Sequence, residues 1–161
     1  VKGVIRPMDE LVTNLKHCLD FFQLPEITHT ESSMGHVRSY INTWKKDIDT
    51  DNKMEIMSLD SKYFLCDETD MKAIIKWDWT DNKKYVKEKY DCDNFAFSFK
   101  AMVDKRFGLN GVGLVIDYSG GHAYNIVVFQ DGSVKIFEPQ SDRWPKAGRG
   151  QYKFQNGSIL I

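Results

Sequence analysis

The sequence predicts an α+β fold, in which helices come first and an antiparallel sheet follows. Residues 91–107 carry an apolar stripe at helical spacing. Three short runs then follow at residues 112–118, 123–129 and 133–137, and all three are rich in β-branched and aromatic residues. We therefore expect one long helix followed by an antiparallel meander.

Length and composition are those of one soluble folded domain. The chain has 161 residues, of which 42% are hydrophobic and 13% aromatic. We expect a single domain over 1–161, with a mainly helical lobe at 1–60 and the long helix and sheet at 61–161. The net charge of −1 gives no electrostatic argument for nucleic acid or an anionic membrane. No apolar run reaches the roughly 18–20 residues that span a bilayer, so neither partner is expected, and the oligomeric state stays open.

The chain has three cysteines, Cys18, Cys66 and Cys92. An odd number without paired spacing argues against a disulfide framework and for a reducing compartment. No CxxC or HExxH pattern is present, so a structural zinc site is not expected. The first residues lack the shape of a signal peptide. The expected location is cytoplasmic, in a bacterial or phage-infected host cell.

The first half of the chain predicts two helices and a polar turn. Apolar residues recur on one face over 7–22 and again over 36–46, with a loop at 26–36 between them. Residues 47–55 then place Asp at the first, third and fifth positions, as an EF-hand calcium loop does. The sixth position is Asn52 rather than Gly, and the twelfth is Ser58 rather than Glu. A solvated acidic turn therefore stays the alternative to a cation site.

Short elements lead up to the long helix. Residues 54–58 and 62–65 are strand candidates, and a short helix capped by Thr69 or Asp70 continues to Trp77. Trp77 and Trp79 precede Cys92 in a region dense in aromatic residues. Such residues either belong to the core or form the wall of a substrate cleft.

The long helix places a thiol at its start. Asp91 is the expected N-cap, Cys92 falls in the first turn, and Gly108 stands at the left-handed C-cap position. Free N–H groups at a helix start stabilise an anion, so they favour the thiolate of Cys92. The carboxylates of Asp91 and Asp93 oppose it. A nearby imidazolium or a bound cation would offset them, which is one reason to consider calcium with Asp91 and Asp93 as ligands.

A histidine and a carboxylate lie on neighbouring expected strands. His122 follows Gly120-Gly121, which let the loop approach a cleft, and Glu138 ends the next strand. If the connecting loop has two residues, His122 and Glu138 lie on opposite faces of the sheet. If it has three, residues 130–132 with Gly132 left-handed, both lie on one face together with Gln140. A thiol site requires the three-residue loop.

The end of the chain predicts one more hairpin. Residues 151–155 and 158–161 flank an Asn156-Gly157 pair, which is typical of a type I′ turn.

The motifs Asp91-Cys92-Asp93-Asn94-Phe95-Ala96, His122-Ala123-Tyr124-Asn125 and Glu138-Pro139-Gln140 occur in the order of transglutaminase-like and papain-like cysteine enzymes. Residues 63–142 resemble more specifically the papain-like, C-terminal domain of fungal chimerolectins and related phage proteins. The resemblance implies a papain-like core with an N-terminal helical segment. It also implies Cys92 as nucleophile, His122 as base, and Glu138 or Gln140 as the residue that orients His122. Part of that group depends on calcium, although Asn94 stands where an Asp is frequent.

The expected function is therefore a cysteine hydrolase, a thiol protease-like enzyme that cleaves a peptide or related amide by acyl transfer through Cys92. Its partner would be a peptide or protein substrate, bound beside Trp77, Trp79 and Gly121. The sequence requires no cofactor but allows calcium. A non-catalytic binding or phage structural module that keeps the fold is the alternative, and a cell-wall amidase is a third hypothesis.

Overall fold

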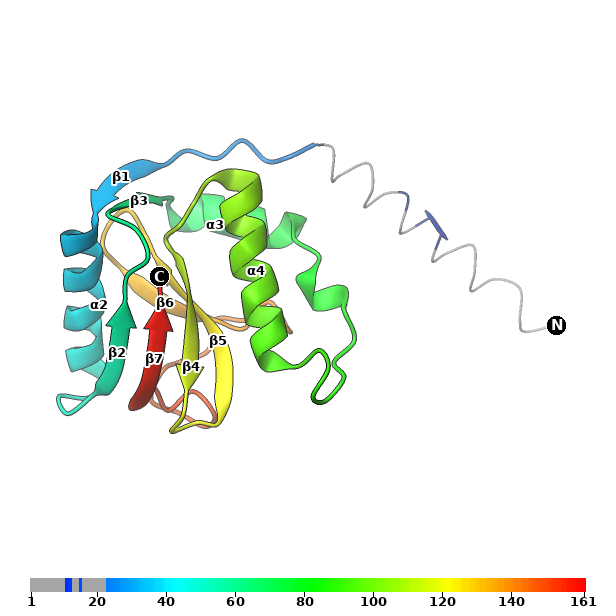
Figure 1. Cartoon of the computed structure of the whole chain (residues 1–161). Coiled ribbons are helices and arrows are strands. Elements are labelled where there is room, and N and C mark those ends of the chain that lie inside the picture. The colour runs from blue at the N-terminus through cyan, green and yellow to red at the C-terminus, as the bar shows by residue number, and fades with distance from the viewer. Residues whose placement is uncertain (1–10, 13–14, 16–22) are drawn as a thin grey trace.

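The computed structural model describes residues 11–12, 15 and 23–161. A five-stranded sheet stands between helix α2 (Met34–Ile48) on one face and helix α4 (Cys92–Phe107) on the other (Figure 1). Strands β1 (Thr30–Ser33) and β3 (Lys62–Leu65) form a separate two-stranded ribbon. Most of the helix expected over residues 7–22, including Cys18, lies outside the described residues.

The sheet is mixed, with strand order β2-β7-β4-β5-β6. Its members are β2 (Lys53–Met57), β4 (Val112–Asp117), β5 (His122–Val128), β6 (Val134–Phe137) and β7 (Asn156–Leu160). Strand β7 pairs in parallel with β2 and antiparallel with β4, whereas β4, β5 and β6 form an antiparallel meander. Strand β2, from the first sixty residues, thus belongs to the same sheet as the C-terminal elements.

The expected C-terminal hairpin is wrong, and with it the purely antiparallel sheet. Asn156 and Gly157 do not turn the chain but begin β7, which enters between β2 and β4. Gly157 is needed because a Cβ atom there would lie 2.0 Å from the carbonyl oxygen of Ile116. Gly157 therefore allows two backbone segments to approach closely, whereas the sequence predicted that it would form a turn.

The hairpin between β5 and β6 has the three-residue loop. Phe129 N–H donates to the Ser133 carbonyl over 2.9 Å, Gly132 has φ of +83°, and Asn125 pairs with Phe137. This register confirms the prediction that His122 and Glu138 lie on one face of the sheet.

Two apolar cores fill the space between the sheet and its helices. On the α2 face, fully buried Val37 and Ile41 pack with the inward residues of the sheet and with Phe154. On the α4 face, Phe99 and Val103 pack with Val127 and with the helix α3 (Glu68–Trp77).

Helix α4 agrees with the sequence, whereas α2 extends two residues beyond the predicted 36–46 at each end, and strand β1 lies in the segment 26–36 that was expected to be a loop. Helix α4 begins at Cys92 after Asp91 and ends at Gly108 in the left-handed conformation, as expected. The N-cap of α3 is Asp67 rather than the predicted Thr69 or Asp70, because the side chain of Asp67 accepts the N–H of Asp70 over 2.8 Å. A 3-10 turn, η1 (Thr80–Asn82), lies between α3 and α4.

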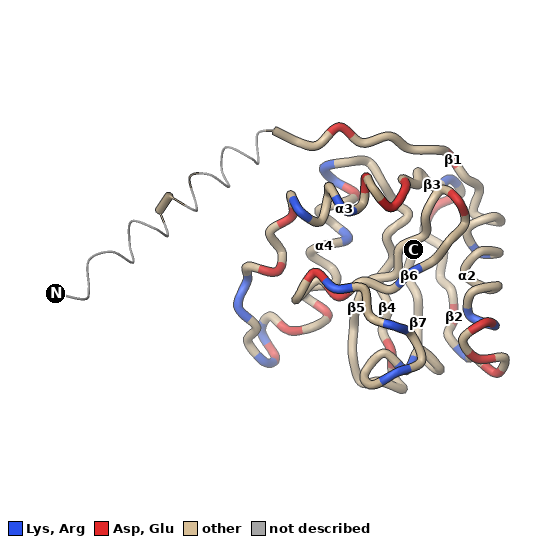
Figure 2. The backbone as a smooth tube through the Cα atoms, turned by 180° about the vertical axis from the view of Figure 1, so that it is seen from behind, with Lys and Arg blue, Asp and Glu red and all other residues tan. Residues whose placement is uncertain are grey.

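Charged residues of both signs alternate along the backbone, and no segment of one sign dominates the view in Figure 2. Within the described part of the chain, no helix has the length and apolar character that crossing a membrane requires.

Candidate functional site at the start of helix α4

The first turn of α4 holds the half-buried Cys92. A reciprocal capping box fixes this turn, in which the Asp91 side chain accepts a backbone N–H of the first turn and Asn94 Oδ1 accepts the Asp91 N–H over 3.1 Å. Asn94 therefore has a structural role in this chain. Asp91 also accepts the N–H of Glu88, a residue with φ of +60°, and so holds the preceding loop against the helix.

The start of β5 holds His122 in a defined orientation. His122 Nε2 lies 2.7 Å from Glu138 Oε2, and the two side chains are 10% and 6% exposed. A carboxylate can only accept a hydrogen bond, so the proton between His122 and Glu138 belongs to Nε2. In the neutral imidazole, Nδ1 is then the nitrogen that can accept a hydrogen bond. This is the relation predicted between a base and the residue that orients it.

Glu138 is held as a carboxylate by three donors. Its oxygens accept from His122, from the hydroxyl of Tyr152 over 2.8 Å, and from the backbone N–H of Gln140 over 3.2 Å. Burial would raise the pKa of Glu138, but these hydrogen bonds outweigh it and the pKa lies below its usual value. Burial and the adjacent Glu138 raise the pKa of Tyr152 to about 12. Tyr152 is therefore a stable donor at neutral pH.

A buried aspartate positions the turn that leads into His122. Asp117 is 1% exposed and accepts from the N–H of Gly120 over 2.9 Å, the N–H of Phe154 over 2.8 Å and the hydroxyl of Tyr124 over 3.1 Å. Gly120 has to be a glycine, because a Cβ atom there would lie 1.9 Å from the carbonyl oxygen of Gln151. The turn is thus fixed from both sides.

Asn125 joins the two elements that carry the site. It is fully buried, and its Nδ2 donates to the carbonyl of Ala96 in α4 over 2.9 Å and to that of Gly113 in β4 over 3.1 Å. Helix α4 and strand β5 begin at the same end of the molecule (Figure 1). Cys92 and His122, which start these elements, therefore lie at that common end.

Of the three predicted residues, the structure joins His122 to Glu138 by a hydrogen bond, and the His122 ring contacts Tyr124 and Tyr152. In the described part of the chain, no hydrogen bond joins Cys92 Sγ to His122. His122 uses Nε2 for Glu138, so Nδ1 is the nitrogen left to face a thiol.

The carboxylates around Cys92 form a weak candidate cation site. Ligand atoms of Asp91, Cys92 and Asp93 all lie within 4.8 Å of one another. A hydrogen bond between the two carboxyl groups lowers the pKa of Asp91 and raises that of Asp93. Calcium takes six to eight oxygen ligands, and this set offers two carboxylates beside a thiol. The remaining ligands would have to be backbone carbonyls and water, so the residues fit a low-affinity site only.

The acidic turn after α2 is closed by hydrogen bonds of its own side chains. The side chain of Asp49 accepts the N–H of Asp51 over 3.0 Å, and Asn52 bonds the N–H of Met54 and the carbonyl of Phe154. These bonds make a tight turn into β2. Among the described residues, 91–93 make up the one cluster of metal-type ligands.

The residues proposed for a cleft wall are spread out. Trp77 packs edge-on against Phe107, with ring centroids 5.4 Å apart. Phe107 ends α4, about 22 Å along the helix from Cys92. Trp79 is 39% exposed next to η1, and Gly121 has φ of +63° with open space around its Cα. Gln140 contributes its backbone N–H to Glu138.

Sequence reasoning missed Tyr152 and Asp117 as parts of the site. The sequence predicts Tyr152 in a strand of a C-terminal hairpin. In the structure, residues 141–155 instead pass close to Glu138, so that the Tyr152 hydroxyl donates a hydrogen bond to it. Asp117 had one available signal, since an aspartate inside an apolar strand run indicates a buried hydrogen-bonded carboxylate.

Comparison with known families and structures gives one family match. The model of the ricin-type beta-trefoil lectin C-terminal domain matches residues 33–154. No curated protein matches the chain closely enough to be compared.

Two solved structures share the fold. One is the PSL1a–E64 complex, with 21% identity and a TM-score of 0.60 over 81% of this chain and 51% of that one. The other is the Polyporus squamosus lectin bound to the human-type influenza-binding epitope Neu5Acα2-6Galβ1-4GlcNAc, with 20% identity and a TM-score of 0.62 over 81% and 49%. The chain thus spans about half the length of these structures, and at this identity the likeness concerns the fold alone.

These findings correct three expectations. The family is one of lectin C-terminal domains and a matched structure is a lectin, so the assignment to a papain-like or transglutaminase-like core is overturned in favour of a lectin C-terminal domain with a mixed sheet. The description as a hydrolase or cysteine protease is overturned by the same matches. The peptide or protein substrate is overturned as well, because the matched lectin is described with a sugar epitope.

The resemblance to the C-terminal domain of fungal lectins is confirmed, and the alternative of a binding module agrees with the matches better than the enzyme does. The family model covers residues 33–154, which is most of the chain. The chain belongs to the family of ricin-type beta-trefoil lectin C-terminal domains.

Proposed function

We propose that this domain is a carbohydrate-binding module of a lectin-type protein. The observation that carries the proposal is the family match over residues 33–154 together with the fold shared with a lectin described in complex with a sialylated epitope. The described chain contributes a mixed sheet with helices on both faces. A sugar site in this domain would therefore be built on this sheet and its helices.

Binding of glycans to the 161-residue chain tests the proposal. The probe is Neu5Acα2-6Galβ1-4GlcNAc, with Galβ1-4GlcNAc and a disaccharide of glucose as comparisons, measured by saturation-transfer NMR and calorimetry. We expect binding of at least one galactose-containing glycan in the micromolar to millimolar range, about −8 to −4 kcal/mol. The absence of transfer to any glycan at millimolar concentration would overturn the proposal.

We also propose that Cys92 is a nucleophilic thiol whose proton His122 accepts through Nδ1. The observation that favours it is the bond between His122 Nε2 and Glu138, which fixes the ring and leaves Nδ1 as acceptor. The start of α4 adds free N–H groups that favour a thiolate. A rearrangement that brings the two side chains together would be required, because the structure does not bond Cys92 to His122.

Alkylation by iodoacetamide, mapped by peptide mass spectrometry, tests the role of Cys92. Cys66 is an internal control, since burial foremost, and then Asp70, raises its pKa to about 12. We expect Cys92 to react faster than a free thiol at pH 7 and to lose this advantage in His122→Ala. E64, which one matched structure contains, gives a second readout as an adduct mass on the peptide of Cys92. Equal rates in wild type and His122→Ala would reject the thiol proposal and leave the carbohydrate proposal untouched.

A further inference from the structure

We propose that the outer edge of strand β2 is a latent docking surface for the same strand of a second copy of this chain, and that Arg38 and Lys45 of α2 keep this edge closed. The inference goes beyond the carbohydrate and thiol proposals and depends on neither. Strand β2 stands at one end of the sheet, and three of its five residues are exposed. It is the more open of the two sheet edges, because Val134 and Ile136 of β6 are only 6% and 1% exposed.

The pairing of β2 with β7 decides which backbone groups reach the outer edge. The N–H of Lys53 and the C=O of Met57 form hydrogen bonds with the segment 155–161, over 2.7 and 3.0 Å. Successive residues of a paired strand direct their backbone groups to alternate sides. The N–H and C=O groups of Met54 and Ile56 therefore point away from β7, and no strand of the described chain pairs with them.

Side chains occupy three of these four outward groups. Lys45 Nζ donates to the carbonyl of Met54, and Arg38 Nη1 donates to the carbonyl of Ile56 over 2.9 Å. The side chain of Asn52 accepts the N–H of Met54 over 3.0 Å. Within the described chain, the N–H of Ile56 is the one outward group without a bonding partner. An edge whose carbonyls are already bonded to charged donors offers few groups to an incoming strand.

Helix α2 is oriented so that both cations reach the strand. Arg38 and Lys45 are seven residues apart and therefore lie on one face of the helix. They meet Ile56 and Met54 in reverse order, because α2 and β2 run in opposite directions. Burial, followed by the charge of Arg38, lowers the pKa of Lys45. Two like charges held this close repel each other, and the hydrogen bonds to the two carbonyls offset that repulsion.

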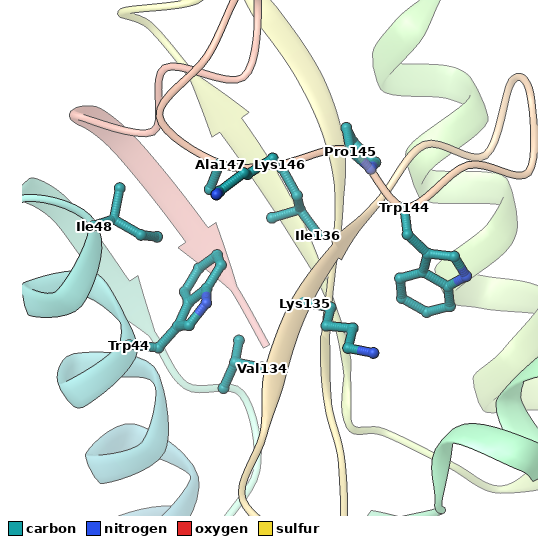
Figure 3. A pocket seen from close by; sticks show the side chains of 9 residues that line it. All are labelled: Trp44, Ile48, Val134, Lys135, Ile136, Trp144, Pro145, Lys146 and Ala147. Atoms are coloured by element: carbon teal, nitrogen blue, oxygen red, sulfur yellow. The ribbon is translucent and has the colours of Figure 1, made fainter.

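Apolar contacts hold α2 on the sheet independently of its two cations. Ile41 is fully buried, and the Trp44 ring packs edge-on against Phe154, with ring centroids 4.9 Å apart. Figure 3 shows Trp44 projecting from α2 towards Ile136 and Ala147. Removal of the cations should therefore open the edge of β2 while the helix stays in place.

The charges on β2 match a second copy of the same strand. Lys53 and Glu55 are exposed on one face of β2, and neither forms an ion pair with a described residue. An antiparallel pairing of two β2 edges about Met54 would place Lys53 of each copy opposite Glu55 of the other, which is a favourable cross-strand pair. Such a pairing is two-fold symmetric, and each copy would then cover the open edge of the other.

The test is the double variant Arg38→Met with Lys45→Met in the 161-residue chain, followed by sedimentation velocity from about 1 to 100 µM. Methionine keeps an unbranched apolar side chain but cannot donate, so both carbonyls become free. We expect the variant to self-associate with an apparent Kd at least about tenfold below that of the wild type. The substitutions make the net charge of −1 more negative by two, which by itself opposes association. Lost repulsion therefore cannot explain a dimer.

Amide hydrogen exchange at Ile56 distinguishes docking from loosening. Pairing with a second copy should slow exchange of this N–H by about tenfold or more, whereas a variant that is merely less stable would exchange faster there. Addition of Glu55→Lys to the double variant should abolish the dimer, because Lys53 of one copy would then face a like charge on the other.

Lys46→Met is the matched control, since Lys46 is exposed in the same turn as Lys45 and no hydrogen bond joins it to β2 in the described chain. Arg38→Lys with Lys45→Arg keeps both donors and should sediment as the wild type does. Circular dichroism establishes that each variant is folded, and the two single methionine variants serve as the test if the double variant unfolds. Sedimentation equal to the wild type, faster exchange at Ile56, or the same dimer in Lys46→Met would each overturn the inference. None of these results bears on glycan binding or on the thiol.

Discussion

His122 Nε2 and Glu138 Oε2 lie 2.7 Å apart because the hairpin between β5 and β6 turns over three residues. A loop shorter by one residue would place the two side chains on opposite faces of the sheet. The relation therefore depends on Gly132, which lies roughly 20 Å along the strand from Glu138, taking six residues at about 3.3 Å each. Conformation at the hairpin and chemistry at the site are linked through strand register.

Gly132→Ala should lower the free energy of unfolding by about 1–3 kcal/mol. The substitution strains a left-handed residue with φ of +83° and places a methyl group 2.8 Å from the ring of Tyr40. Urea unfolding measures the change. Gly108→Ala is the control, since its φ is +64° with nothing within 4 Å, and it should cost only about 1 kcal/mol. Equal effects of the two substitutions would show that the Tyr40 contact contributes nothing.

Asn125→Leu should lower stability by about 1–3 kcal/mol and loosen the start of α4. The side chain bonds the carbonyls of Ala96 and Gly113 from a fully buried position, and the substitution leaves both without this donor. Native-state hydrogen exchange of the amides in the first two turns of α4 should accelerate more than that of its last turn. Uniform exchange along α4 would indicate that Asn125 acts on global stability alone.

Glu138→Gln should remove a pH-dependent part of stability. The pKa of Glu138 is depressed in the folded state, so its contribution is present above the unfolded pKa of about 4.3 and is lost as the pH falls through the lower folded value. The wild type should lose stability relative to Glu138→Gln between about pH 5 and pH 3. Free energies of unfolding at pH 7, 5 and 3 measure this difference, and parallel curves for the two proteins would contradict it.

Asp142→Asn should stabilise the protein at neutral pH, by about 1 kcal/mol. Burial, followed by the charges of Asp81 and Asp78, raises the pKa of Asp142 to about 7, and its Oδ1 is buried without a hydrogen-bond partner. The folded pKa is raised for an acid, so the cost begins above the unfolded value of about 3.9 and grows up to about pH 7. Asparagine also suits the φ of +50° at this position.

The stabilisation by Asp142→Asn should be absent at pH 3.5 and full at pH 8, as measured by thermal unfolding. Asp131→Asn is the control, because the hydrogen bond from Ser133 lowers the pKa of that carboxyl and its substitution should destabilise the protein. A stabilisation by Asp142→Asn that does not change with pH would point to the backbone conformation rather than to the charge.

Millimolar calcium should raise the midpoint of thermal unfolding by a small amount, since binding to the folded state alone stabilises it. The cation would bind between the carboxyl groups of Asp91 and Asp93, whose ligand atoms lie within 4.8 Å of one another. Asp93→Asn should abolish the shift, whereas Asp49→Asn in the acidic turn after α2 should leave it unchanged. The same shift in both variants would place the calcium elsewhere.

Local signals in the sequence were sufficient for the helices and the meander. Helix α4 begins after Asp91 and ends at Gly108, as the capping preferences of these residues predict. The hypothesis of a thiol site required a three-residue loop between β5 and β6, and this is the loop observed. These features depend on residues close together in the chain. The relation of His122 to Glu138 followed from them by strand geometry.

The pairing of strands that are far apart in the chain could not be predicted from the sequence. The same Asn156-Gly157 pair that is typical of a turn forms part of β7, because β7 is stabilised by β2 and β4 from distant parts of the chain. The contacts of Tyr152 and Asp117 also join segments far apart in sequence. The motif order suggested an enzyme, and the family match indicates a lectin domain, because three residue types in order do not define a function.

The position of β7 has a consequence for how the protein is made. Residues 156–160 occupy the place between β2 and β4, so β2 has no neighbour in the sheet until they are present. During synthesis the meander of β4, β5 and β6 can assemble first, whereas the apolar surfaces of β2 and α2 remain exposed until β7 has been made. Closure then requires pairing across about a hundred residues, which is entropically slow. Loss of β7 would divide the nascent protein into two halves that expose strand edges to other chains.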